Sequence, residues 1–287
     1  MVSVDYLLKF IQEDAPFGDI TSETIIPDTE CRALISVEQT ATVAGLEEAS
    51  MLFQYFDVLV DQAVSDGSLV NPSDTLLTLQ GKAKNILLVE RTALNIIGRM
   101  SGIATATKNF VESVRSVNPK CRIAATRKTC PGFRKLDKKA VILGGGDPHR
   151  WNLSDGILIK DNHLALVGLE EAIAKAKARS RYHRVEVEVE SKEDAIRAAR
   201  SGADIIMFDN MTPKKVQESI NSLKRENLRH KLLIEISGGV NADNIAQYAI
   251  LGVDIISIGA LTHSVKNIPV HLHILSPKNK MREPIHL

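Results

Sequence analysis

Residues 184–209, RVEVEVESKEDAIRAARSGADIIMFD, contain one complete strand–helix–strand unit. Valine and glutamate alternate over 185–190, which is the two-residue period of a β-strand. Ser191, with an acid three residues later, is typical of the start of a helix, and Gly202 is typical of its end. An apolar strand follows at 204–208. Because a helical connection between two strands runs them in the same direction, this unit predicts a pair of parallel strands.

The same alternation continues through the chain from about residue 120. The expected strands are 122–125, 156–159, 184–189, 204–208, 232–236 and 254–258, and the expected helices are 168–180, 191–201, 213–226 and 242–251. Thr212 before Pro213 marks one helix start, and Gly252 marks one helix end. Six or seven such units, with glycines in the loops after the last two strands, favour a (β/α) barrel over an open sheet.

The residues before 120 follow a different plan, in which strands and helices do not alternate strictly. The expected elements are a helix over 3–14, β-like segments over 31–81 with a helix at 45–55, and mostly helix over 82–116. A further strand is expected at 269–275, followed by a polar tail at 276–287. We therefore expect an N-terminal α/β domain over 1–107, joined by 268–287, and a barrel domain over 108–267.

Composition excludes several classes of protein. The chain has 287 residues, a net charge of +1, 44% hydrophobic residues and 25% charged residues, which is typical of globular proteins. A near-neutral charge argues against nucleic acid or a membrane surface as partner. No signal-peptide pattern or run of about 20 apolar residues is present. Three scattered cysteines, Cys31, Cys121 and Cys130, indicate reduced thiols, so we expect a cytoplasmic protein.

Positive charge is concentrated in one window of this neutral chain. Residues 122–163 contain nine Lys or Arg and four acids. Lys135, Lys138 and Lys139 are spaced as an exposed helix surface. Lys160 instead directly follows the short apolar run 156–159, and Arg127 comes just after the apolar run 123–125. A local excess of positive charge in a neutral protein points to a small polyanionic ligand.

In barrel enzymes the functional side chains follow the C-terminal ends of the strands. This rule selects Arg127, Lys128, Lys160, the glutamates of 184–190, Asp209, Ser237, Gly238, Gly239 and Gly259. The three glutamates 186, 188 and 190 share one face of their strand. Carboxylates inside a barrel require cations or a metal, and the alternative is an edge strand with a solvated face. Glu188, the last one inside the strand, is the best candidate for ligand contact.

Two neighbouring loops have the features of a phosphate site. Residues 233–240 run from a strand through Ser237-Gly238-Gly239 toward a helix, and 257–264 repeat this arrangement one strand later. Free backbone N–H groups at such turns bind phosphate. The inferred ligand is a phosphorylated sugar with a second anionic group, or such a sugar with a separate anionic co-substrate. Glu188 and Asp209 would hold a divalent cation or face a developing positive charge.

Several short motifs, in one order along the chain, resemble the quinolinate phosphoribosyltransferase family, the carboxylating nicotinate-nucleotide pyrophosphorylases. They are Glu90–Asn95, Ser101–Thr105, Thr126–Thr129 with Pro131-Gly132, His149-Arg150, Leu158–His163, Glu186–Val189, Asp209-Asn210 and Ser237–Gly239. The resemblance covers nearly the whole chain, from Gly18 to Thr262. It implies an N-terminal α/β sandwich domain, an open seven-stranded α/β barrel, and a homodimer whose chains complete each other's sites.

The resemblance also implies a reaction and a set of roles. The reaction is Mg²⁺-dependent transfer of phosphoribosyl from phosphoribosyl pyrophosphate to quinolinate, giving nicotinate mononucleotide, pyrophosphate and CO₂. The residues implied for the quinolinate carboxylates are Arg127, His149, Arg150 and, from the partner chain, Arg91. Those implied for substrate, ribose and Mg²⁺ are Lys128, Lys160, Glu188 and Asp209, which would be the catalytic group. Those implied for the 5-phosphate are Ser237, Gly238, Gly239, Gly259 and His263.

Some residues favour other functions for the same set of motifs. Pro148 and the segment 151–155 are similar to a related branch associated with molybdenum-transport operons, whereas Lys160–His163 and Arg91 favour the quinolinate enzymes. A transferase that accepts nicotinate or another anion, and a non-catalytic anion binder, are the remaining alternatives. The acids Glu188 and Asp209 argue against the last one, because a plain anion binder has no use for them.

Overall fold

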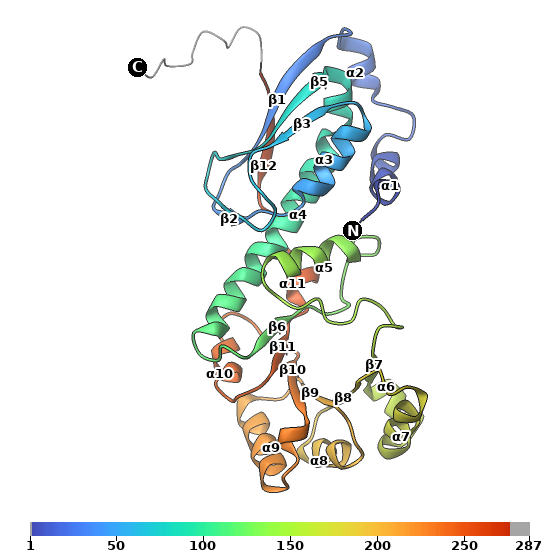
Figure 1. Ribbon diagram of the computed structural model, residues 1–287, viewed down its shortest axis with the longest axis vertical. Coiled ribbons are helices and arrows are strands. Elements are labelled where there is room, and N and C mark those ends of the chain that lie inside the picture. The colour runs from blue at the N-terminus through green and yellow to red at the C-terminus, as the bar shows by residue number, and fades with distance from the viewer. Residues whose placement is uncertain (1, 276–287) are drawn as a thin grey trace. The chain divides into compact units, whose positions relative to one another are not determined.

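A computed structural model of the chain describes residues 2–275, and the expected polar tail at 276–287 lies outside them (Figure 1). The described residues form two compact units. Unit 1 consists of 2–106, 135–144 and 265–275, and unit 2 consists of 107–134 and 145–264. The sequence had not separated 135–144 from the barrel. The long helix α4 (Ala83–Arg115) contributes residues to both units.

Unit 1 is built on an antiparallel sheet of order β12-β1-β5-β3. Its strands are β1 (Glu30–Val37), β3 (Leu59–Gln62), β5 (Thr75–Lys82) and β12 (Val270–Leu275), with β2 (Ala41–Thr42) and β4 (Leu69–Val70) as a separate pair. The helices are α1 (Val4–Asp14), α2 (Ile20–Ile25), α3 (Leu46–Tyr55), the first part of α4, and α5 (Arg134–Leu143). Figure 1 shows α3 lying along the sheet.

The core of unit 1 follows from the strand and helix periods. On β1, the alternating residues Ala33, Ile35 and Val37 are buried, as the two-residue period of a strand requires. On α1, Leu7 and Ile11 are buried four residues apart, on one face of the helix. The expected strand at 269–275 is β12, and it pairs antiparallel with β1 along its whole length.

Unit 2 is a parallel α/β structure. Its strands are β6 (Arg122–Ala124), β7 (Ile157–Ile159), β8 (Val185–Val189), β9 (Ile205–Asp209), β10 (Leu233–Ser237) and β11 (Ile255–Ser257), in the order β6-β11-β10-β9-β8-β7. A parallel bridge from Ala124 to Asp147 adds a seventh segment beside β6. Among the described residues β7 pairs with β8 alone, so the barrel is open.

The helices of unit 2 are α6 (Asp161–Leu164), α7 (Leu169–Arg179), α8 (Lys192–Arg200), α9 (Pro213–Arg225), α10 (Ile245–Ala249) and α11 (Ala260–His263), with a 3-10 turn at Arg229–Lys231. Three of these helices, α7, α8 and α9, begin and end within one residue of the bounds expected from the sequence. Ser191 and Thr212 each accept a backbone N–H at a helix start. Gly202 and Gly252 have positive φ angles just after α8 and α10.

All six expected strands of unit 2 are confirmed to within a few residues. The alternative of a solvated edge strand for 184–189 was wrong, because β8 lies between β7 and β9. The sequence analysis missed α2, β3 and β4 in unit 1, and the expected helix 242–251 is the shorter α10. Among the described helices, none is both long and apolar enough to cross a membrane.

Candidate active site

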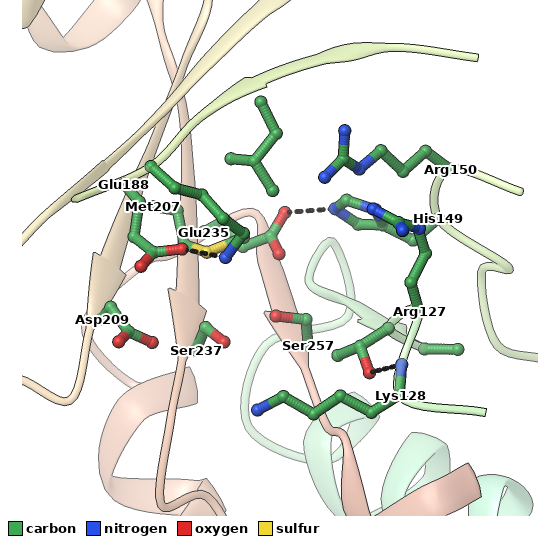
Figure 2. Close-up of a pocket in the computed structure, with 14 residues that line it drawn as sticks. Arg127, Lys128, His149, Arg150, Glu188, Met207, Asp209, Glu235, Ser237 and Ser257 are labelled. Carbon is green, nitrogen blue, oxygen red and sulfur yellow. Dashed lines mark hydrogen bonds and ion pairs between the residues drawn. The ribbon is translucent and has the colours of Figure 1, made fainter. Parts of the chain in front are cut away.

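A cavity of about 400 Å³ lies at the C-terminal ends of the strands of unit 2 (Figure 2). That volume is within the usual range for a small-molecule site. The lining residues come from all six strands and the loops after them: Ala125, Thr126, Arg127, Lys128, His149, Arg150, Leu158, Lys160, Glu188, Met207, Asp209, Glu235, Ser237 and Ser257. Most of the residues that the rule of strand ends selected therefore line one common cavity.

One side of the pocket is cationic. Figure 2 shows Arg127, Lys128, His149 and Arg150 on the side opposite Glu188 and Asp209. Arg127 follows β6, and its Nε is buried without a hydrogen-bond partner among the described residues. The pKa of the Arg150 guanidinium is lowered, first by its burial and then by the charge of Arg127. Two neighbouring guanidinium groups repel each other unless an anion lies between them.

The loop after β6 is fixed by hydrogen bonds on both sides of Lys128. The backbone N–H of Lys128 donates to Oγ1 of Thr126 at 3.1 Å. The hydroxyl of Thr262 donates to the carbonyl oxygen of Lys128 at 2.9 Å. A Cβ placed on Gly259 would lie 3.1 Å from Cδ of Lys128 and 3.2 Å from the ring of His263. Lys128, Gly259 and His263 therefore lie together, as the implied phosphate site requires.

His149 makes contacts that the sequence analysis did not foresee. Its Nε2 lies 3.6 Å from Oε2 of Glu186 and 3.4 Å from Oε2 of Glu235, and both glutamates are buried. Burial alone would lower the pKa of His149, but the two carboxylates raise it to about 10. Burial, and then the charge of Glu235, raise the pKa of Glu186. His149 is therefore a cation at neutral pH.

The other side of the pocket carries two carboxylates. Glu188 forms an ion pair with Lys160, which follows β7. Asp209 ends β9, and its Oδ2 accepts a hydrogen bond of 2.7 Å from the side chain of Asn210. The side chain of Glu188 is 11% exposed, and Asp209 is partly exposed. The carboxylate groups of both residues can therefore reach a ligand in the cavity. Carboxylates in this position stabilise positive charge on a ligand or bind a hard cation.

The turn after β10 has the shape that its sequence predicted. Gly238 has a φ of +83°, and a Cβ there would lie 2.2 Å from Oδ1 of Asn210. No other residue fits such a position without moving the β9 loop. Ser237 lines the cavity, whereas Gly238, Gly239, Gly259 and His263 are not among its lining residues. These four residues lie in or just after the turns that follow Ser237 at the end of β10 and Ser257 at the end of β11.

Comparison with known proteins decides the family. The sequence model for the N-terminal domain of quinolinate phosphoribosyl transferase matches residues 19–101, and the model for its C-terminal domain matches 103–273. The chain belongs to the quinolinate phosphoribosyl transferase family. The family resemblance inferred from the motifs is thus confirmed, and it extends over both units.

Curated and solved relatives of this quinolinate phosphoribosyl transferase family member span nearly its whole length. A probable nicotinate-nucleotide pyrophosphorylase (carboxylating) from Archaeoglobus fulgidus is 46% identical over 260 residues, covering 91% of this chain and 99% of the relative. A relative of the same activity from Mycobacterium leprae is 36% identical, covering 94% and 96%. The solved nicotinate-nucleotide pyrophosphorylase from Ehrlichia chaffeensis is 32% identical with a TM-score of 0.90, covering 96% and 99%.

Arg91, which was expected to come from the partner chain, lies apart from the other residues expected in the site of this family member. Arg91 is exposed on α4, and it does not line the cavity that the described residues of unit 2 form. The sequence analysis missed Glu235, Ser257 and Met207 as lining residues. Glu235 carried a signal that could have been used, because it is a charge enclosed by apolar neighbours in a buried strand. Such a charge needs a partner inside the barrel.

Proposed function

We propose that this chain is a quinolinate phosphoribosyltransferase of NAD biosynthesis. It transfers the phosphoribosyl group of phosphoribosyl pyrophosphate to quinolinate, and the products are nicotinate mononucleotide, pyrophosphate and CO₂. The family membership of both units supports this proposal. The single observation in the fold that carries it is the division of one cavity into a cationic side and a carboxylate side. Free thiols at Cys31, Cys121 and Cys130 support a cytoplasmic location.

The cationic side suits a dicarboxylate. The guanidinium groups of Arg127 and Arg150 offer paired N–H donors, which match the two oxygens of a carboxylate better than an ammonium group does. Arg127 has a buried Nε–H that no described residue accepts. A bound carboxylate would take that hydrogen bond and would also relieve the repulsion between the two guanidinium groups.

The carboxylate side suits the ribose. As the bond from the anomeric carbon to pyrophosphate breaks, positive charge develops on the ribose ring, and Glu188 and Asp209 stabilise it. The pyridine nitrogen of quinolinate then forms the new bond to that carbon. The ring nitrogen now carries a positive charge, so it accepts the electron pair of the adjacent carbon–carboxylate bond, and CO₂ leaves. A proton from solvent replaces the lost carboxylate. Lys160, paired with Glu188, places a cation beside the departing pyrophosphate.

The donor set also fits Mg²⁺. This ion prefers oxygen ligands, and in phosphate-transfer sites it is held by one or two carboxylates together with substrate phosphates. Glu188 and Asp209 supply such carboxylates at the ends of neighbouring strands β8 and β9. When bound there with phosphoribosyl pyrophosphate, Mg²⁺ would neutralise negative charge on the leaving pyrophosphate. The loops at Ser237–Gly239 and Gly259–His263 would hold the 5-phosphate through their backbone N–H groups.

The proposal includes a homodimer in which Arg91 of one chain completes the quinolinate site of the other. Exposure of Arg91 on α4 supports this, because an exposed arginine is accessible to a second chain. Mixing inactive Arg91→Ala and Lys128→Ala chains should restore part of the activity, since hybrid dimers contain one site with both residues intact. Failure of the mixture to regain activity would contradict the shared site.

One assay tests the reaction itself. The protein is incubated with quinolinate, phosphoribosyl pyrophosphate and Mg²⁺, and nicotinate mononucleotide and CO₂ are followed. We expect both products in equal amounts, and we expect chelation of Mg²⁺ to abolish them. Parallel reactions contain nicotinate in place of quinolinate. Product from nicotinate alone would favour the alternative acceptor, and no product from either would favour the molybdenum-transport-associated branch or a plain anion binder.

A further inference from the structure

Two members of the buried cluster of His149, Glu186 and Glu235, namely the glutamates, have no role in the reaction as described above. Glu235 is fully buried, and neither of its carboxylate oxygens has a hydrogen-bond partner among the described residues. Glu186 is also buried, and its Oε1 lacks a partner as well. Burying two carboxylates costs several kcal/mol by a general estimate, and the one ring of His149 is the cation paired with both. Their retention at the wall of a ligand cavity requires a reason.

The cluster joins three separate parts of the barrel. Glu186 lies on β8, Glu235 lies on β10, and His149 follows the seventh segment at Asp147. His149 has a φ of +55°, a conformation that costs about 1–2 kcal/mol for a residue with a Cβ. Its backbone N–H donates to Oδ1 of Asp147 at 2.7 Å, which holds this turn in place. The strained turn brings the ring to the two glutamates inside the barrel.

The cluster also lies where two cavities meet. The ligand cavity at the C-terminal strand ends is lined by His149, Arg150 and Glu235. A second cavity of about 440 Å³, lined by residues at the N-terminal strand ends such as Ile205 and Ile255, includes the same three residues. His149 and Glu235 therefore form part of the floor of the ligand cavity, and Glu186 lines the second cavity behind them. A floor residue that moved would change the depth of the site.

The chemistry of imidazole gives this arrangement its consequence. Nε2 of His149 faces two carboxylates, so it must carry a proton in either charge state. In a neutral ring Nδ1 would then be an acceptor, which repels the carboxylate of a ligand. In a charged ring Nδ1 is a donor, which attracts it. The contacts of the ring with described residues are made through Nε2, which leaves the hydrogen bond of Nδ1 unused.

We propose that Glu186 and Glu235 are positioning residues that keep the His149 ring charged and fixed, so that its Nδ1–H serves as a permanent donor to an anionic substrate. This inference rests on the proposed function for the identity of that anion, the quinolinate carboxylate. The charged groups around the ring are Glu186 and Glu235 from β8 and β10, Arg127 from the loop after β6, and Asp147 and Arg150 from its own segment. The two guanidinium groups disfavour a divalent metal ion in the cluster.

The decisive variant is Glu235→Gln, which keeps the shape of the side chain and removes its charge. The pKa of His149 should then fall toward its ordinary value, and the ring should become neutral at mildly alkaline pH. The KM for quinolinate should therefore rise on the order of tenfold between about pH 6.5 and about pH 8.5, while the KM for phosphoribosyl pyrophosphate stays unchanged. Wild-type protein should show a flat KM over this range, because its His149 remains charged until about pH 10.

Two further variants separate charge from structure. Glu235→Asp keeps the charge, so its KM profile should remain flat. Glu48→Gln is the matched control, because Glu48 is a buried glutamate of unit 1 that is paired with Lys139 and does not line the cavity. A Glu235→Gln protein whose KM for quinolinate remains independent of pH would overturn the proposal. So would an equal loss for both substrates without any pH dependence.

A measurement that needs no activity completes the test. Nitrogen NMR of histidine-labelled wild-type protein reports the charge of each ring, and the signal of His149 is identified by its absence in His149→Asn. We expect a charged ring throughout neutral pH, and titration within neutral pH would overturn the proposal. Absence of product from wild-type protein would count against the proposed function alone. A stoichiometric transition-metal ion that is lost in Glu235→Gln would show a metal site instead and overturn the inference.

Discussion

The two units differ in how completely their buried charged groups are hydrogen-bonded. In unit 1, Arg99 donates two hydrogen bonds of 2.8 and 2.9 Å to the fully buried Asp137. Lys139 contacts Glu47 at 2.6 Å and Glu48 at 2.8 Å. In the cavity of unit 2, Nε of Arg127 and both carboxylate oxygens of Glu235 are buried without a hydrogen-bond partner among the described residues, and Glu235 has only the longer ion pair of 3.4 Å with His149. One oxygen of Glu48 also lacks a partner, but its other oxygen is bonded to Lys139.

This difference teaches how to separate structural charges from functional ones. A buried pair whose hydrogen bonds are complete stabilises the fold only as long as both partners remain. A buried charge whose hydrogen bonds are incomplete costs stability in the free protein, and a ligand can supply what is missing. We therefore expect substitutions in unit 1 pairs to lower stability and substitutions in the unit 2 cavity to lower activity.

The largest effect should come from breaking the pair in unit 1. Asp137→Asn leaves Arg99 without its carboxylate, and the free energy of unfolding should fall by about 3 kcal/mol, the lower end of the range for a buried pair because Arg99 keeps 21% of its side chain exposed. Urea unfolding followed by circular dichroism measures this loss. The control is Asp28→Asn, since Asp28 pairs with Lys82 on the surface. If the free energy of unfolding fell equally in the two variants, the buried pair would contribute no more to stability than the surface pair.

Arg127→Ala should have a smaller effect, and on activity instead. It removes a charged hydrogen-bond donor from the cationic side of the cavity, so kcat/KM for quinolinate should fall by the equivalent of about 2–3 kcal/mol. Because the Nε of Arg127 has no partner in the described structure, the free energy of unfolding should change by less than about 1 kcal/mol. Steady-state kinetics and urea unfolding check both statements.

The matched control for this experiment is Lys120→Ala, because Lys120 is an exposed residue of unit 2 and its substitution removes the same charge. It should leave kcat/KM unchanged. A near-normal kcat/KM in Arg127→Ala, or a large loss of stability in that variant, would contradict the assignment of Arg127 to the ligand.

The smallest effect should come from a surface pair of unit 2. Arg197 contacts Glu170 and Asp194, but about half of each of the Arg197 and Glu170 side chains is exposed. Solvent screens such pairs, so Arg197→Ala should leave the urea midpoint within the error of the measurement. A shift as large as that of Asp137→Asn would mean that completeness of pairing, rather than burial, determines the effect.

Sequence was sufficient for the elements that have a strong period. The strands of unit 2 were found because each is a short apolar run bounded by cap residues and glycines, as Ser191 and Gly202 show around α8. By contrast β4 has only two residues, and β3 exposes three of its four residues. Neither has a buried face long enough to produce an alternating pattern. Pairing with β5 or β2, not local sequence, makes them strands.

Residues that line the cavity were predictable where a side chain lies at or just after the C-terminal end of a strand, and not where it lies deeper in the barrel. Lys160, Glu188 and Asp209 were found by that rule. The environment of His149 was not predicted. Its φ of +55° turns the ring back into the barrel, and no local sequence pattern indicates such a turn. The contact with Glu235 joins residues far apart in the chain, so it depends on the register of the parallel strands.

The pairing of β12 with β1 has a consequence for the order of folding during synthesis. Arg32 pairs with Leu275, near opposite ends of the described chain. The sheet of unit 1 therefore lacks one edge strand until residues 270–275 have left the ribosome, whereas all strands of unit 2 have been made before β12. The barrel, although second in the sequence, can be complete while the first sheet still exposes the edge of β1. A nascent chain stalled before β12 would be the form most exposed to strand-mediated aggregation.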